Sequence, residues 1–161
     1  MLREDASFIL EEDLNILYNE DRGAYGAEAE EAALTHLQEQ GFNAVRTKDY
    51  LGEEWTPKLD AEMGDILLLN PKNGEIVSYI DVKRALQHQG LELLGTVSKT
   101  EASDAFRARN NSFYYLYNKD LSYNITIKAN TLRPDPRFGK FWTTDEELEA
   151  EQVEFPVVKT N

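Results

Sequence analysis

The stretch from residue 64 to residue 83 constrains the fold of this chain more than any other, because it has the form of two strands joined by a tight turn. Four consecutive apolar residues, 66–69, are followed by the segment 70–74, which contains a proline and an Asn-Gly pair. A second apolar run over residues 76–82 follows that turn. Turn-forming residues between two β-prone runs predict an antiparallel hairpin.

Charged residues are concentrated on one face of this predicted hairpin. Successive side chains of a strand alternate between its two faces, so Asp81 and Lys83 point the same way and Val82 points the other way. If the pairing places Asp65 on that face as well, two carboxylates and one ammonium group converge at the ends of two apolar strands. Charge is costly there unless it is compensated, and a magnesium ion would be a suitable partner for the carboxylates.

The order of these residues resembles the signature of the PD-(D/E)XK nuclease superfamily. The signature is present here as Gly64-Asp65, a spacer of 15 residues, and Asp81-Val82-Lys83. The family often has a proline where Gly64 stands, but that proline supplies no metal ligand. In this family a glutamate from the preceding helix completes the site, so the upstream sequence should contain one.

A helix is predicted from about residue 25 to residue 40, closed by the following glycine. At about 100° per residue, Glu30 lies within about 60° of the apolar positions 33, 34 and 37, whereas Glu28 and Glu31 lie outside that stripe. A glutamate in a core-facing stripe is destabilising without a ligand, so Glu30 is a candidate metal contact, direct or through water. The simpler interpretation is a boundary residue that reaches solvent near the helix start.

The resemblance extends over residues 26–46, which are similar to the opening of small archaeal-type Holliday junction resolvases. It implies an α/β fold with a restriction-endonuclease-like core, in which helices flank a central mixed β-sheet. It also implies Mg²⁺, with Mn²⁺ as a substitute, held by Asp65, Asp81 and the main-chain carbonyl of Val82. Glu30 would bind the metal or one of its waters, and Lys83 would orient the attacking water.

Composition is consistent with one domain over residues 1–161, with an acidic helical extension at 1–22 and an acidic helix and tail at 143–161. The chain contains no cysteine, which excludes disulfides and thiol catalysis. It also contains no long apolar run and no secretory signal, so a cytoplasmic protein is expected.

The net charge of −13 is unfavourable for a protein that binds DNA. Its distribution is uneven, because residues 83–140 carry ten Lys or Arg against five Asp or Glu, while residues 1–31 carry ten acidic and two basic side chains. The acidic termini are interpreted as solvated surface, as docking sites for a protein partner, or as a duplex-mimicking face.

The remaining elements are assigned from local signals. Helices are expected at residues 6–19, at 99–109 with Ser98 as the capping residue, and from Thr144 onwards. Strands are expected at 42–47, 112–117 and 123–128, and an edge strand or docking tail at 153–158. Residues 48–63 and 133–142 are expected to be loops, the first of them overhanging the site.

Several basic and polar residues downstream of Lys83 are candidates for substrate contacts. Each of them is also explained by an ordinary surface or helix-terminal role. The candidates are Arg84, Gln87, Arg107, Arg109, Arg133 and Arg137.

The sequence therefore predicts a metal-dependent DNA endonuclease whose Glu30, Asp65, Asp81 and Lys83 hydrolyse phosphodiester bonds. Junction resolution or symmetric cutting would require a homodimer. The alternative is a protein of the same fold that binds DNA or a partner, or mimics DNA, without cutting on its own. Fold resemblance does not decide between these functions.

Overall fold

The computed structural model of the protein describes residues 28–84, 86–87, 93–96, 100–118, 123–132, 141–143 and 152–156. The expected helices at 6–19 and after Thr144 lie outside these residues, as do Arg133 and Arg137. No helix within the described ranges combines the length and apolarity that crossing a membrane requires.

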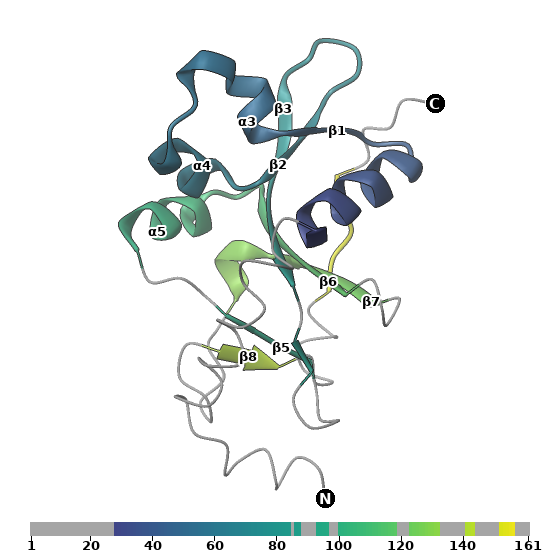
Figure 1. The fold of residues 1–161 in the computed structure, drawn as a ribbon, viewed down its shortest axis with the longest axis vertical. Helices are drawn as coiled ribbons and strands as arrows, with labels where there is room; N and C mark the ends of the chain where they lie inside the picture. The colour runs from purple at the N-terminus through teal and green to yellow at the C-terminus, as the bar shows by residue number, and fades with distance from the viewer. Residues whose placement is uncertain are drawn as a thin grey trace, which may run out of the picture.

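A five-stranded mixed sheet forms the centre of the molecule, which confirms the expected α/β class (Figure 1). The strand order is β1-β2-β3-β6-β7, and every neighbouring pair is antiparallel except β3 and β6, which are parallel. The strands are β1 (Asn43–Arg46), β2 (Ile66–Leu69), β3 (Ile76–Arg84), β6 (Ser112–Asn118) and β7 (Tyr123–Lys128). A second, three-stranded sheet has the order β4 (Leu86–Gln87), β5 (Leu93–Thr96) and β8 (Phe141–Thr143).

The predicted hairpin is confirmed as β2 and β3. Asparagine side chains organise its turn, because Asn70 Oδ1 accepts from the Lys72 N–H at 2.9 Å and Asn73 Oδ1 accepts from the Glu75 N–H at 3.0 Å. Gly74 takes a φ of 74°, a value that glycine reaches without steric cost. Local turn chemistry therefore brings Leu69 opposite Ile76, and an irregularity between Leu68 and Leu69 shifts the register of the remaining pairs by one residue.

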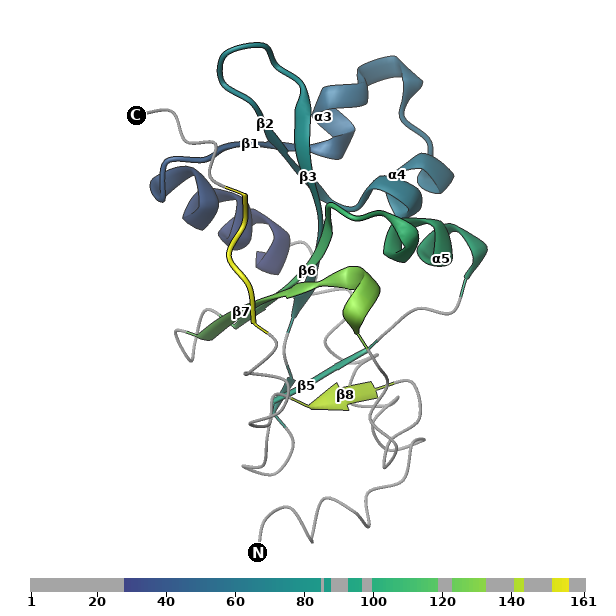
Figure 2. The same cartoon turned by 180° about the vertical axis from the view of Figure 1, so that it is seen from behind.

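Helices cover the two faces of the sheet, as the views from opposite sides show (Figures 1 and 2). The helix over residues 28–39 packs Ala33 and Leu37 onto one face, where they meet Ile66 and Ile80. The other face is packed by Phe106 of α5 (Glu101–Ala108), which lies beside α4 (Pro57–Met63). The sheet is thus the middle layer of three.

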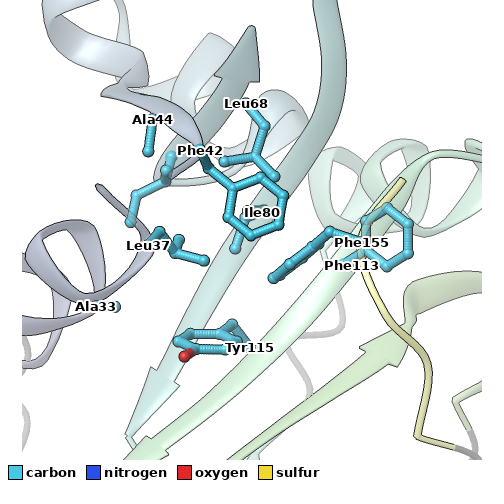
Figure 3. Packing of buried hydrophobic residues seen from close by; sticks show 10 residues of the cluster. Ala33, Leu37, Phe42, Ala44, Leu68, Ile80, Phe113, Tyr115 and Phe155 are labelled. Atoms are coloured by element: carbon cyan, nitrogen blue, oxygen red, sulfur yellow. The ribbon is translucent and has the colours of Figure 1, made fainter. Parts of the chain in front are cut away.

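Aromatic side chains close the core on the first of these faces (Figure 3). Phe155 packs edge-on against Phe42 and Phe113, with ring centroids 5.7 and 5.3 Å apart. Its segment, 152–156, runs beside β7, where the Val153 N–H donates to the Thr126 carbonyl at 2.9 Å. Residues 152–156 of the expected C-terminal segment therefore dock through the buried Phe155 ring, the partly buried Val153 and an isolated bridge between Ile127 and Gln152.

The expectation of a loop at residues 48–63 is wrong, because short helices occupy most of this segment. Those residues belong to α3 (Thr47–Leu51), a 3-10 helix (Gly52–Glu54) and α4. Thr56 caps α4 by accepting from the Leu59 N–H at 3.1 Å, and Pro57 occupies the first turn, where its missing N–H costs nothing. These helices are five and seven residues long, too short to show an apolar period in the sequence.

Two further boundaries differ from expectation. The cap of α5 is Thr100 rather than Ser98, since the Thr100 hydroxyl accepts from the Ser103 N–H at 3.1 Å. Residues 141–142, expected in a loop, are in β8, where they pair with β5. Pairing between β5 and β8 joins segments far apart in the chain, so no local signal predicted it.

Candidate active site

Asp65 and Asp81 are brought together at the point where β2 begins. Ile66 pairs with Ile80, so the same antiparallel register sets Asp65 opposite Asp81 on the same face. The Asp65 N–H donates to the Ile80 carbonyl at 2.7 Å, and the Asp65 Oδ2 accepts from the Val82 N–H at 3.0 Å. Asp65 therefore lies on the same face as Asp81 and Lys83, as expected if the strands paired in this register. Main-chain groups of β3 hold the Asp65 carboxylate in one orientation.

The environment of Asp65 disfavours its charge. Burial raises the pKa of Asp65 well above its ordinary value, and the negative charge of Asp81, with which it shares a hydrogen bond, raises that pKa further. Glu30 adds to the effect, whereas Lys83 opposes it. Two carboxylates this close need a proton or a cation between them.

Lys83 provides one positive charge at the pair. Its Nζ lies 3.1 Å from the Asp81 Oδ2, and the two side chains remain 17% and 23% exposed, so a ligand can reach both. The alternation predicted for β3 is confirmed by this contact and by the packing of Ile80 and Val82 into the opposite core.

Glu30 forms an ion pair with a residue of β1. Its Oε1 is 3.2 Å from Nη1 of Arg46, the last residue of β1, and Arg46 also pairs with Glu31. Burial raises the pKa of Glu30, Arg46 lowers it, and Asp60 and Asp81 raise it. As the helix wheel predicted, Glu30 is partly buried while Glu31 is exposed; its role as a metal contact stays a prediction.

The carboxylate pair suits a hard cation that keeps most of its waters. Within the described residues, no three His, Cys, Asp or Glu side chains gather closely enough to form a metal centre by themselves. Magnesium commonly uses only one or two carboxylates. The N–H and C=O of a strand residue point to the same side, so the Val82 carbonyl faces the same edge of β3 as Asp65 and offers a third oxygen. The residues at this edge therefore fit magnesium.

The backbone at position 64, beside Asp65, passes so close to β3 that only glycine fits there. Gly64 has a φ of 89°, and a Cβ there would lie 2.5 Å from the Ile80 carbonyl oxygen. Proline, which is locked near a φ of −65°, cannot take this conformation. The Gly64 carbonyl accepts from the buried Thr47 hydroxyl at 2.6 Å, so a hydrogen bond also fixes the backbone at this position.

The predicted substrate contacts are only partly described. The Arg107 Nη1 donates to the Tyr114 hydroxyl at 3.2 Å, and Arg107 also pairs with Asp104. Arg109 donates to the Glu62 carbonyl and lies over the Tyr79 ring, 4.3 Å from its centroid. Arg84 and Gln87 are in β3 and β4, and their side chains lie outside the described part of the structure.

Two acidic residues of α4, Asp60 and Glu62, contact residues close to them in the sequence. Asp60 Oδ1 accepts from the Trp55 indole N–H at 2.9 Å, and Glu62 lies 4.0 Å from the Lys58 ammonium group.

Sequence reasoning missed Tyr114 and the pairing of Arg46 with Glu30. Tyr114 is next to Asp81 in the parallel pairing of β3 with β6, and Arg46 reaches across from β1 to a helix. Both contacts depend on how separate elements meet, so no signal in the sequence indicated them.

Comparison with known proteins assigns no family. No protein-family model matches the chain, and no curated protein is significantly similar to it in sequence. Among solved structures, it is similar to a bacterial homing endonuclease, with 14% identity, 74% of this chain and 86% of that chain covered, and a TM-score of 0.47. It is also similar to a nuclease from a fusellovirus, with 15% identity, 76% and 79% covered, and a TM-score of 0.32. Both neighbours are nucleases, but likenesses this distant do not assign an activity to this chain.

Proposed function

We propose that this protein is a magnesium-dependent nuclease of the PD-(D/E)XK type that hydrolyses phosphodiester bonds in DNA. The observation that carries the proposal is the contact of Asp65 with Asp81, with Lys83 3.1 Å from Asp81, where β2 and β3 meet. An aspartate whose pKa is raised, in contact with a second carboxylate and near a lysine, is costly for stability, and such costs are concentrated at functional sites.

Each residue of the group has a separate task. Asp65 and Asp81 hold the cation, together with the Val82 carbonyl. The Lys83 ammonium group, partly exposed beside Asp81, orients the attacking water and stabilises negative charge that develops on the phosphate. When bound, the metal ion activates water and neutralises the phosphate.

Glu30 has a position at the edge of this site rather than inside it. Arg46 neutralises it at 3.2 Å, and its charge still reaches Asp65. Glu30 is therefore assigned to a water bound to the metal, while Arg46 holds it in place.

The test is a magnesium titration of wild type, Asp81→Ala and Lys83→Ala, in which cleavage of labelled single-stranded, duplex and branched DNA is measured at low salt. We expect metal-dependent cutting by wild type and its loss in both variants, with only a modest loss of binding. Lys72→Ala, in the exposed hairpin turn, is the matched control and should cut like wild type.

Unchanged turnover in Asp81→Ala or Lys83→Ala would refute these roles. No cutting by any form, together with no heat on adding magnesium or manganese, would instead favour a binding protein of this fold. The acidic termini would then be the first place to look for a protein partner.

A further inference from the structure

Tyr114 is directly beside the carboxylate pair. In the parallel pairing of β3 with β6, Tyr114 is the partner of Asp81, so both side chains point to the same face of the sheet. Neighbouring strands lie about 4.8 Å apart. Tyr114 is 1% exposed, and its ring packs against Phe106 of α5 with centroids 5.5 Å apart.

The Tyr114 hydroxyl is within electrostatic reach of the site. Burial raises the pKa of Tyr114, and the hydrogen bond from Arg107 lowers it. The charge of Asp81 raises the same pKa, and the charge of Lys83 lowers it. The hydroxyl therefore connects Arg107 to the surroundings of Asp81 and Lys83.

Arg107 is held at the edge of this face. Its Nη1 donates to the Tyr114 hydroxyl at 3.2 Å, and Asp104, one turn earlier on α5, pairs with its other terminal nitrogen. The Arg107 side chain is 19% exposed, so a ligand can reach the guanidinium group. The hydrogen bond to Tyr114 fixes where that group points, whereas Asp104 competes with a ligand for it.

The second arginine near the end of α5 has a different environment. Arg109 donates to the Glu62 carbonyl and stacks on Tyr79, which precedes Asp81 by two residues. Two residues of a strand span about 6.6 Å, so this contact lies farther from the carboxylates along β3. Arg109 connects α4 to Tyr79 of the sheet, whereas Arg107 is bound to Tyr114, the neighbour of Asp81 across β3 and β6.

We propose that Tyr114 positions Arg107 to bind the DNA phosphate next to the one that is cut. This inference rests on the proposed nuclease function. Lys83 and the bound cation serve the scissile phosphate, and Arg107 of α5 is bound to Tyr114 of β6, the strand next to Asp81. A planar guanidinium group binds phosphate through two parallel hydrogen bonds, and a fixed orientation lowers the entropy cost of doing so.

The experiment uses the full chain in two assays. Affinity for a short labelled duplex and for the corresponding single strand is measured with calcium over a range of salt concentrations, and kcat and KM are measured with magnesium. The variants are Arg107→Gln, Tyr114→Phe, their double variant and Asp104→Asn. Tyr115→Phe is the matched control, because it removes the neighbouring buried hydroxyl on the opposite face, which has no hydrogen-bond partner among the described residues.

Arg107→Gln should raise Kd and KM by roughly tenfold or more, because it removes a charged hydrogen bond to phosphate. It should leave kcat nearly unchanged, because a neighbouring phosphate is bound equally in the ground and transition states. Its plot of log K against log salt should be shallower by about 0.7–0.9, the value for one phosphate contact.

Tyr114→Phe should also raise KM, but it should add little in the double variant, because it acts through Arg107. Asp104→Asn should tighten DNA binding, because it removes a carboxylate that competes for Arg107. Tyr115→Phe should behave like wild type in both assays.

Equal affinity and equal salt dependence in wild type and Arg107→Gln would overturn the inference, and so would additive effects of the two single substitutions. These results are distinct from a failure of the nuclease proposal, which would appear as no cutting by wild type in magnesium. In that case the calcium binding data alone decide the role of Arg107.

Discussion

Replacing Gly64 with alanine tests how tightly the backbone is packed beside the carboxylate pair. The added Cβ would lie 2.5 Å from the Ile80 carbonyl oxygen, 2.8 Å from its carbon and 2.9 Å from a ring carbon of Phe106. Gly64 also has a φ of 89° and a ψ of 179°, a region used almost only by glycine. The backbone strain costs about 1–3 kcal/mol, and the overpacking adds about 1–3 kcal/mol.

The two costs sum to roughly 2–6 kcal/mol, which corresponds to a fall in Tm of roughly 5–20 °C for a chain of this size. Gly74→Ala is the matched control. Gly74 has a φ of 74° but nothing within 4 Å of its Cβ position, so only backbone strain of about 1–2 kcal/mol applies.

Thermal and urea unfolding, followed by circular dichroism, measure both variants. Because Asp65 follows Gly64 directly and donates to Ile80, Gly64→Ala should also weaken magnesium binding, whereas Gly74→Ala should not. Equal losses of stability in the two variants would refute the claim that close approach to Ile80, rather than backbone conformation alone, requires glycine at position 64.

Two further substitutions test the environment of the site. Asp65→Asn should stabilise the metal-free protein at neutral pH: the pKa of Asp65 is raised on folding, so wild type loses stability as the pH rises from the unfolded value through the folded one. Urea unfolding between acid and neutral pH should give a free energy of unfolding that changes less with pH in the variant than in wild type. Saturating magnesium should make wild type the more stable of the two. Parallel pH profiles of the two proteins would contradict this reasoning. Thr47→Val should cost about 1–3 kcal/mol, because it leaves the buried Gly64 carbonyl without its hydrogen bond. Thr131→Val removes a similar hydrogen bond of 2.7 Å to the Lys128 carbonyl at the exposed surface, where water can replace it. A smaller loss of stability is therefore expected, and a loss equal to that of Thr47→Val would count against the argument.

Local patterns predicted the part of the molecule that carries the chemistry. The hairpin follows from two apolar runs on either side of a turn rich in Asn, Pro and Gly. The register that places Asp65 opposite Asp81 also depends on an irregularity in the pairing between Leu68 and Leu69, which the sequence did not indicate. The helix wheel likewise separated Glu30 from its neighbours, because a helix that packs on a sheet buries one stripe.

Contacts between distant segments were not predictable in this way. The short helices of residues 47–63 lack an apolar period and depend on caps and packing. The sequence by itself determined which charged residues share a strand face, because side chains along a strand alternate between its two faces with a period of two residues. Only the tertiary structure decided that Arg46 pairs with Glu30 and that Tyr114, which binds Arg107, is the neighbour of Asp81, because a parallel register between β3 and β6 is set by packing across the whole sheet.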